Sequence, residues 1–157
     1  MTKGRIIIAD IEKISCNKEW ILSQIAQRYV EKYQKHKRET DKKQELIAGY
    51  LLKEYLGVEN DAQLVMNKNG KPMLVDARKH FNLSHSGKYV VLAIADQEVG
   101  IDIEKEKNKK KKEWENEKAK EYFIETRCID EYYVSLATEE KISIETEWFA
   151  GNGKEVK

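Results

Sequence analysis

Three strand patterns follow one another with only short turns between them, and they constrain the fold more than any other part of the chain. Residues 81–86 (FNLSHS) predict a short strand that ends in a loop at Gly87. Residues 89–95 (YVVLAIA) are almost continuously apolar, and residues 99–103 (VGIDI) follow after a turn at Asp96. We therefore predict that residues 89–95 and 99–103 form an antiparallel hairpin with a buried centre.

The rest of the chain predicts helices in the first third and strands in the last. Residues 5–11 (RIIIADI) indicate a short buried strand. Residues 17–35 carry apolar side chains at helical spacing after an Asn17 N-cap. A second helix is expected from Thr40 or Asp41 to Leu56, where Gly57 ends it.

The C-terminal third predicts a meander. Its strand-like pieces are residues 121–129, 132–137 and 142–148, separated by short acidic turns. Residues 105–120 are rich in Lys and Glu, which predicts either a solvated helix or a disordered linker.

Length and charge exclude several classes of protein. The chain has 157 residues, which predicts one domain, and its 29 basic and 28 acidic residues leave a net charge of +1. Such a balance gives no general reason to bind nucleic acid or an anionic membrane. No apolar run has the length of a transmembrane helix or an export signal. Cys16 and Cys128 are too few and too isolated for a zinc site or disulfide framework, and we expect a cytoplasmic protein.

Two carboxylates lie two residues apart in residues 100–104 (GIDIE), at Asp102 and Glu104. On a strand they share one face, while Ile101 and Ile103 point into the core. Oxygen ligands on one face suit Mg²⁺, which usually takes only one or two protein carboxylates, and they suit Mn²⁺ as well. The alternative is an edge strand whose acidic residues face solvent.

Two further patterns offer contacts for phosphate. Residues 84–87 (SHSG) combine hydroxyl groups, an imidazole and a flexible backbone, which are the donors that an anion needs. The alternative is a histidine with a purely structural hydrogen bond, and nothing marks a Ser-His-Asp triad. Residues 70–72 (GKP) hold Lys71 on a rigid turn next to Pro72, a pattern that is also common in ordinary turns.

The ordered series GKP, FNLSHSG and GIDIE resembles the 4′-phosphopantetheinyl transferases, most closely the larger, surfactin-synthetase-activating type. The resemblance covers residues 6–104. It implies an α+β fold, 4′-phosphopantetheinyl transferase-like, with helices packed on a small antiparallel sheet. It also implies transfer of the phosphopantetheine arm of coenzyme A to a serine of an acyl or peptidyl carrier protein. Adenosine 3′,5′-bisphosphate is the leaving group, and Mg²⁺ bridges the diphosphate.

The resemblance also assigns roles to individual residues. Asp102 and Glu104 are implied metal ligands. The attacking serine also needs an acceptor for its proton, and the candidates are His85 and a metal-bound water. The implied contacts to coenzyme A are Lys71 and Pro72 at the nucleotide end, Ser84 and His85 at the phosphates, and a basic group at the 3′-phosphate made of Lys32, Lys37, Arg38 and Lys43. Gln44 stands where the family often has arginine.

One motif of the family is missing. In the family a helical W-x-x-K-E sequence follows GxDxE, and its glutamate completes the metal site or serves as base. The nearest pattern here, at residues 114–118 (WENEK), has the wrong internal spacing. We therefore expect a complete first lobe over residues 1–104, a linker or exposed helix over residues 105–120, and terminal strands of a shortened second lobe over residues 121–157.

The missing motif leaves alternatives open. The chain is either an active transferase or a catalytically impaired module that binds coenzyme A and a carrier protein. A decayed copy with an incomplete second lobe would expose apolar surface, and a homodimer would cover that surface. Neither a membrane nor a nucleic-acid partner is expected.

Overall fold

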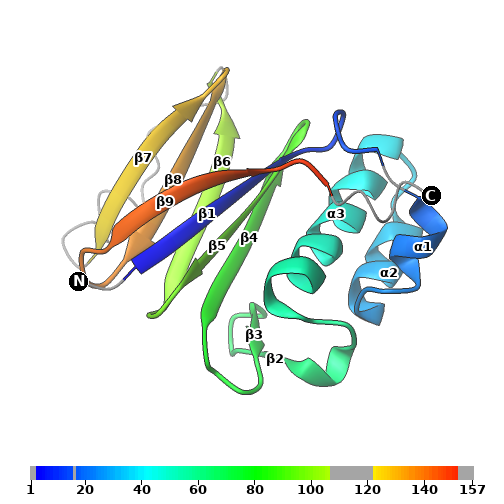
Figure 1. The fold of residues 1–157 in the computed structure, drawn as a ribbon, viewed down its shortest axis with the longest axis horizontal. Coiled ribbons are helices and arrows are strands. Elements are labelled where there is room, and N and C mark those ends of the chain that lie inside the picture. The colour runs from blue at the N-terminus through cyan, green and yellow to red at the C-terminus, as the bar shows by residue number, and fades with distance from the viewer. Residues whose placement is uncertain (1–2, 16, 107–121, 152–157) are drawn as a thin grey trace.

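The computed structural model describes residues 3–15, 17–106 and 122–151 (Figure 1). Its helices are α1 (Lys18–Leu22), α2 (Gln27–Lys35) and α3 (Glu39–Leu56), followed by a short 3-10 turn at Asp61–Gln63. Its strands are β1 (Lys3–Asp10), β2 (Leu64–Met66), β3 (Pro72–Leu74), β4 (His80–Ser86), β5 (Tyr89–Ala95), β6 (Val99–Lys105), β7 (Phe123–Ile129), β8 (Tyr132–Thr138) and β9 (Ser143–Phe149).

The described elements form three layers, with a four-stranded sheet in the middle. This sheet has the order β4-β5-β1-β9, and the helices cover one of its faces while the three-stranded sheet β6-β8-β7 covers the other (Figure 1). The sheet has a hydrophobic core on each face, and alternate residues of β5 point into one or the other. Leu92 packs with the helices, and Val91 packs with the three-stranded sheet. Both are fully buried, which explains why the sequence of β5 is apolar throughout.

The helical predictions are confirmed in outline, with one correction. The Asn17 side chain accepts a hydrogen bond from the Trp20 amide at 2.9 Å and caps α1, and Gly57 ends α3 with a left-handed φ of 69°. The predicted single helix over residues 17–35 is instead two helices, separated at residues 23–26. The break brings α2 close to α3, where a Cβ at Gly49 would lie 2.9 Å from atoms of Ile25 and Tyr29.

The predicted hairpin of residues 89–95 with residues 99–103 is wrong in its pairing. Both strands form, but β5 pairs antiparallel with β4 and β1, while β6 pairs antiparallel with β8. Because both edges of β5 are occupied, β6 leaves this sheet after the turn and packs across its face. The tight turn of the hairpin that does form, β4–β5, contains Gly87.

The predicted meander is half correct. The strands β7 and β8 form the expected antiparallel hairpin, but β9 crosses to the other sheet and pairs parallel with β1. The four-stranded sheet is therefore mixed rather than wholly antiparallel. Arg5 on β1 reinforces this pairing with an ion pair to Glu147 on β9 at 2.9 Å.

Some predictions concern residues outside the described part of the chain. The Lys- and Glu-rich stretch from 107 onward, residues 114–118 and Cys16 are among them. The strand with the GIDIE motif belongs to the same sheet as β7 and β8, and the proposed lobe boundary at residue 104 stays a prediction. Among the described helices, none is both long enough and apolar enough to cross a membrane.

Candidate active site

The strand β4 sends alternate side chains to opposite sides of its sheet. Phe81 and Leu83 pack with the helices, and His85 points to the same side, where it meets α3. Asn82 and Ser84 point to the other side and reach β6. The Ser84 and His85 side chains therefore lie on opposite faces of one strand, although they are adjacent in sequence.

Hydrogen bonds from β4 side chains hold β6 in place. Asn82 Oδ1 accepts the backbone N–H of Ile101 at 2.8 Å, and Ser84 Oγ accepts that of Ile103 at 3.2 Å. These bonds join two different sheets and satisfy amides of β6 on the edge that β8 leaves unpaired. Asp102 lies between the two anchored amides, so the position of its carboxylate depends on β4.

The predicted alternation along β6 is confirmed. Ile101 and Ile103 are buried in the core between the two sheets, and Asp102 and Glu104 are half-buried on the opposite face. Asp102 also lines a pocket of about 350 Å³. Lys71 lines the same pocket, and its Nζ donates to the Val99 carbonyl at 2.7 Å. Burial lowers the pKa of Lys71, and nearby Glu98 opposes part of that effect.

We expect Asn82→Ala to lower the free energy of unfolding by about 1–2 kcal/mol, because the amide of Ile101 loses its acceptor in a partly buried position. Urea denaturation monitored by circular dichroism measures the change. Asn82→Asp keeps an acceptor oxygen and is expected to lose less stability. An alanine variant as stable as the wild type would show that the bond does not hold β6.

A cluster of titratable side chains lies on the helix side of β4. Glu45 on α3 is buried, and its Oε2 lies 3.4 Å from His36 Nε2 and 3.7 Å from His85 Nε2. Burial would raise the pKa of Glu45, but the hydrogen bonds from His85 and His36 and the charge of Lys32 outweigh it and lower the pKa. Lys32 stands beside this cluster on α2, with its Nζ 5.9 Å from the centre of the Tyr29 ring.

Three elements meet at the Gly87 turn next to His85. Gln44 Nε2 donates to the Gly87 carbonyl at 2.7 Å, which ties α3 to the turn. Gly87 has a φ of 57°, and a Cβ at this position would lie 2.2 Å from the hydroxyl oxygen of Tyr132 on β8. Glycine is required here by both its conformation and its lack of a side chain.

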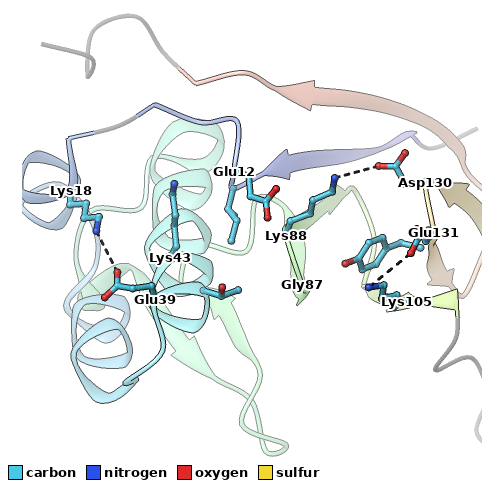
Figure 2. Close-up of a pocket in the computed structure, with 12 residues that line it drawn as sticks. Glu12, Lys18, Glu39, Lys43, Gly87, Lys88, Lys105, Asp130 and Glu131 are labelled. Carbon is cyan, nitrogen blue, oxygen red and sulfur yellow. Dashed lines mark ion pairs between the residues drawn. The ribbon is translucent and has the colours of Figure 1, made fainter.

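The larger pocket, of about 910 Å³, opens between the start of α3, the Gly87 turn and the β7–β8 turn (Figure 2). Four lysines line it among the described residues, and three of them form ion pairs with acidic residues that also line the pocket. These pairs are Lys18 with Glu39 at 3.5 Å, Lys88 with Asp130 at 3.9 Å, and Lys105 with Glu131 at 3.9 Å. Lys43 makes no ion pair within the described residues. It is the cation in this pocket that an anionic ligand can use without displacing an acid.

The structure thus gathers most of the predicted site residues along the line where β4 meets β6 and α3. Lys43 and Lys71 line the two pockets, one on each side, and Pro72 begins β3 next to Lys71. Lys37 and Arg38 are exposed in front of α3 and line neither pocket. Sequence reasoning missed Glu45, His36 and Asn82; for Asn82 a signal existed, because it lies two residues before Ser84 on the same face.

Similarity to a known family shows to which superfamily the chain belongs. A sequence model of the family described as "4′-phosphopantetheinyl transferase, N-terminal" matches residues 14–97. The chain belongs to the 4′-phosphopantetheinyl transferase superfamily. The matched segment contains α1 to α3, the GKP turn and the SHSG strand, and it ends before the GIDIE carboxylates Asp102 and Glu104.

Two curated members of the superfamily match over 58 residues, which is 36% of this chain. They are 4′-phosphopantetheinyl transferase Sfp of Bacillus subtilis, 34% identical over 26% of its own length, and 4′-phosphopantetheinyl transferase gsp of Aneurinibacillus migulanus, 47% identical over 24% of its own length. The matches thus span about a quarter of the length of these relatives.

The carboxylate face of β6 is suited to a hard divalent cation. Within the described part of the chain, no three His, Cys, Asp or Glu side chains lie close enough to hold a metal ion together. Two carboxylates on one face beside an open pocket nevertheless fit Mg²⁺, which binds proteins through one or two carboxylates and takes its other ligands from water and substrate phosphate.

Proposed function

We propose that this chain transfers the 4′-phosphopantetheine group of coenzyme A to a serine of an acyl or peptidyl carrier protein. The observation that carries the proposal is the seam between β4 and β6. There the hydrogen bonds of Asn82 and Ser84 hold the backbone of the GIDIE strand against the SHSG strand, between two pockets that lysines line. Superfamily membership supports the same reaction.

In this proposal Asp102 and Glu104 would hold Mg²⁺, and the bound ion would neutralise the charge of the diphosphate and of the leaving group. Lys43 contacts phosphate, His85 lies beside the phosphate monoester at the 3′ position, and Lys71 with Pro72 lines the nucleotide end. Because His85 lies on the helix face of β4, away from the carboxylate face of β6, its position favours phosphate contact over proton abstraction. The serine oxygen forms a bond to phosphorus, the phosphorus–oxygen bond to adenosine 3′,5′-bisphosphate breaks, and a water molecule accepts the serine proton.

We further propose that β6, β7 and β8 are what remains of a second lobe that is shortened relative to the larger family type. Only two acidic side chains come together on the outer face of β6 in the described residues. This observation favours a second candidate function, a catalytically impaired module that binds coenzyme A and a carrier protein without transfer.

Intact-mass spectrometry distinguishes the two candidates. A panel of apo carrier proteins is incubated with the protein, coenzyme A and Mg²⁺, with parallel samples in excess EDTA. We expect a phosphopantetheine mass gain on at least one carrier and its loss in EDTA. Calorimetry of coenzyme A binding accompanies the assay. Binding without a mass gain would support the impaired module, and neither binding nor mass gain from a folded protein would exclude both candidates.

A further inference from the structure

Glu45 is a buried acid placed where the proposed function needs to accept an anion. Its carboxylate lies 3.4 Å from His36 Nε2 and 3.7 Å from His85 Nε2, and its side chain is only 9% exposed. The two imidazoles come from the α2–α3 connection and from β4, while Glu45 belongs to α3. Two potential phosphate contacts from different segments are thus already engaged by one carboxylate of the protein.

The charge of Glu45 is well supported by its neighbours. The imidazoles of His36 and His85 and the ammonium group of Lys32 all act on it, so it stays ionised at neutral pH despite its burial. It cannot turn away easily, because it sits within the buried stretch of α3 between Gln44 and Leu46. A phosphate that approached His85 would therefore meet a fixed negative charge a few ångströms away, and like charges in a partly buried site repel strongly.

We propose that Glu45 determines substrate specificity by disfavouring a phosphate monoester beside His36 and His85. The inference depends on the proposed function, because it concerns how coenzyme A is bound. Coenzyme A carries one phosphate monoester, at the 3′ position of its ribose, in addition to its diphosphate. With Glu45 in place, the site gains little from that monoester and accepts 3′-dephospho-coenzyme A about as well.

The test compares the two ligands by isothermal titration calorimetry with Mg²⁺ present. We expect the wild type to bind coenzyme A and 3′-dephospho-coenzyme A with affinities within about threefold of each other. Glu45→Gln keeps the shape and removes the charge, and it is expected to bind coenzyme A about tenfold more tightly while its affinity for the dephospho ligand changes little. Glu45→Asp keeps the charge and should discriminate as the wild type does.

Glu31→Gln is the matched control, because it removes one negative charge from an exposed position on α2 that lines neither pocket. Its ligand ratio should equal that of the wild type. If Glu45→Gln does not fold, Glu45→Ser is used, with the same expectation.

Three outcomes overturn the inference. Equal tightening for both ligands would mean that Glu45 opposes negative charge in general and does not select against the monoester. An unchanged ratio in Glu45→Gln would mean that it has no influence on the ligand. Failure of every variant to bind either ligand would instead overturn the proposed function, and the inference with it.

Discussion

Asp102→Asn is expected to reduce the rate of phosphopantetheine transfer by at least about a hundredfold, which is the size of effect seen when one electrostatic contact to a transition state is removed. The amide has the shape of the carboxylate but lacks its charge, so the metal would lose one of its two ionic protein ligands. Timed intact-mass measurements on the carrier give the rate. Binding of coenzyme A in EDTA is expected to stay within about twofold of the wild type, because in the proposed function Asp102 acts through the metal.

Glu98→Gln is the control for this prediction. Glu98 is an exposed acid that lines the same pocket of about 350 Å³ but lies before the first residue of β6. Its loss should leave the rate close to that of the wild type. If turnover of the wild type is slow, Mn²⁺ binding in the presence of coenzyme A, measured by electron paramagnetic resonance, provides a second readout. Equal Mn²⁺ affinity in Asp102→Asn and the wild type would contradict the assignment.

Gly87→Ala is expected to lower the free energy of unfolding by about 2–4 kcal/mol. Two effects add. The φ of 57° is unfavourable for a residue with a side chain, and the new Cβ would lie 2.2 Å from the hydroxyl oxygen of Tyr132, which is buried in the core between the two sheets. Chemical denaturation with urea, followed by far-ultraviolet circular dichroism, measures the loss.

Gly57→Ala measures the conformational part of that loss, so the difference between the two variants gives the steric part. Gly57 has a similar φ of 69°, but a Cβ there would meet nothing within 4 Å, so only the conformational penalty of about 1 kcal/mol is expected. The Tyr132→Phe change removes the clashing oxygen, and in combination with Gly87→Ala it should recover part of the stability. Equal losses at Gly57 and Gly87 would show that Tyr132 yields without penalty.

The sequence predicts the strands well but their partners poorly. The limits of β5 follow from a run of apolar residues between polar turns, and β4 and β6 follow from their alternation. The partner of β6 depends on which edges of β5 are already occupied, and those edges are filled by β1 and β4. Periodicity within one segment does not contain that information. The split between α1 and α2 is hidden for a similar reason, because Ile21, Ile25 and Tyr29 keep helical spacing across the break.

The same contrast holds for the candidate site. The shared face of Asp102 and Glu104 can be predicted from the local sequence, because side chains two residues apart on a strand point to the same side. The structure agrees with this prediction. The hydrogen-bond partner of Ser84 cannot be predicted from the local sequence, because its hydroxyl oxygen accepts from a backbone amide in a different sheet. Glu45 is hardest to predict: it lies in a helical sequence that otherwise supplies core residues, and its imidazole partners come from two different segments, the α2–α3 connection and β4.

The parallel pairing of β1 with β9 has a consequence for how this molecule is synthesised. Arg5 and Glu147, which pair across these strands, are separated by 142 residues, so β1 is made long before its neighbour exists. Until then one side of an isoleucine-rich strand offers unpaired amides and carbonyls, the arrangement from which intermolecular strand addition starts. Contacts this distant in sequence also slow folding. Translation arrest or proteolysis before residue 143 would therefore produce a fragment prone to self-association, and a chaperone that shields β1 during elongation would raise the yield of native protein.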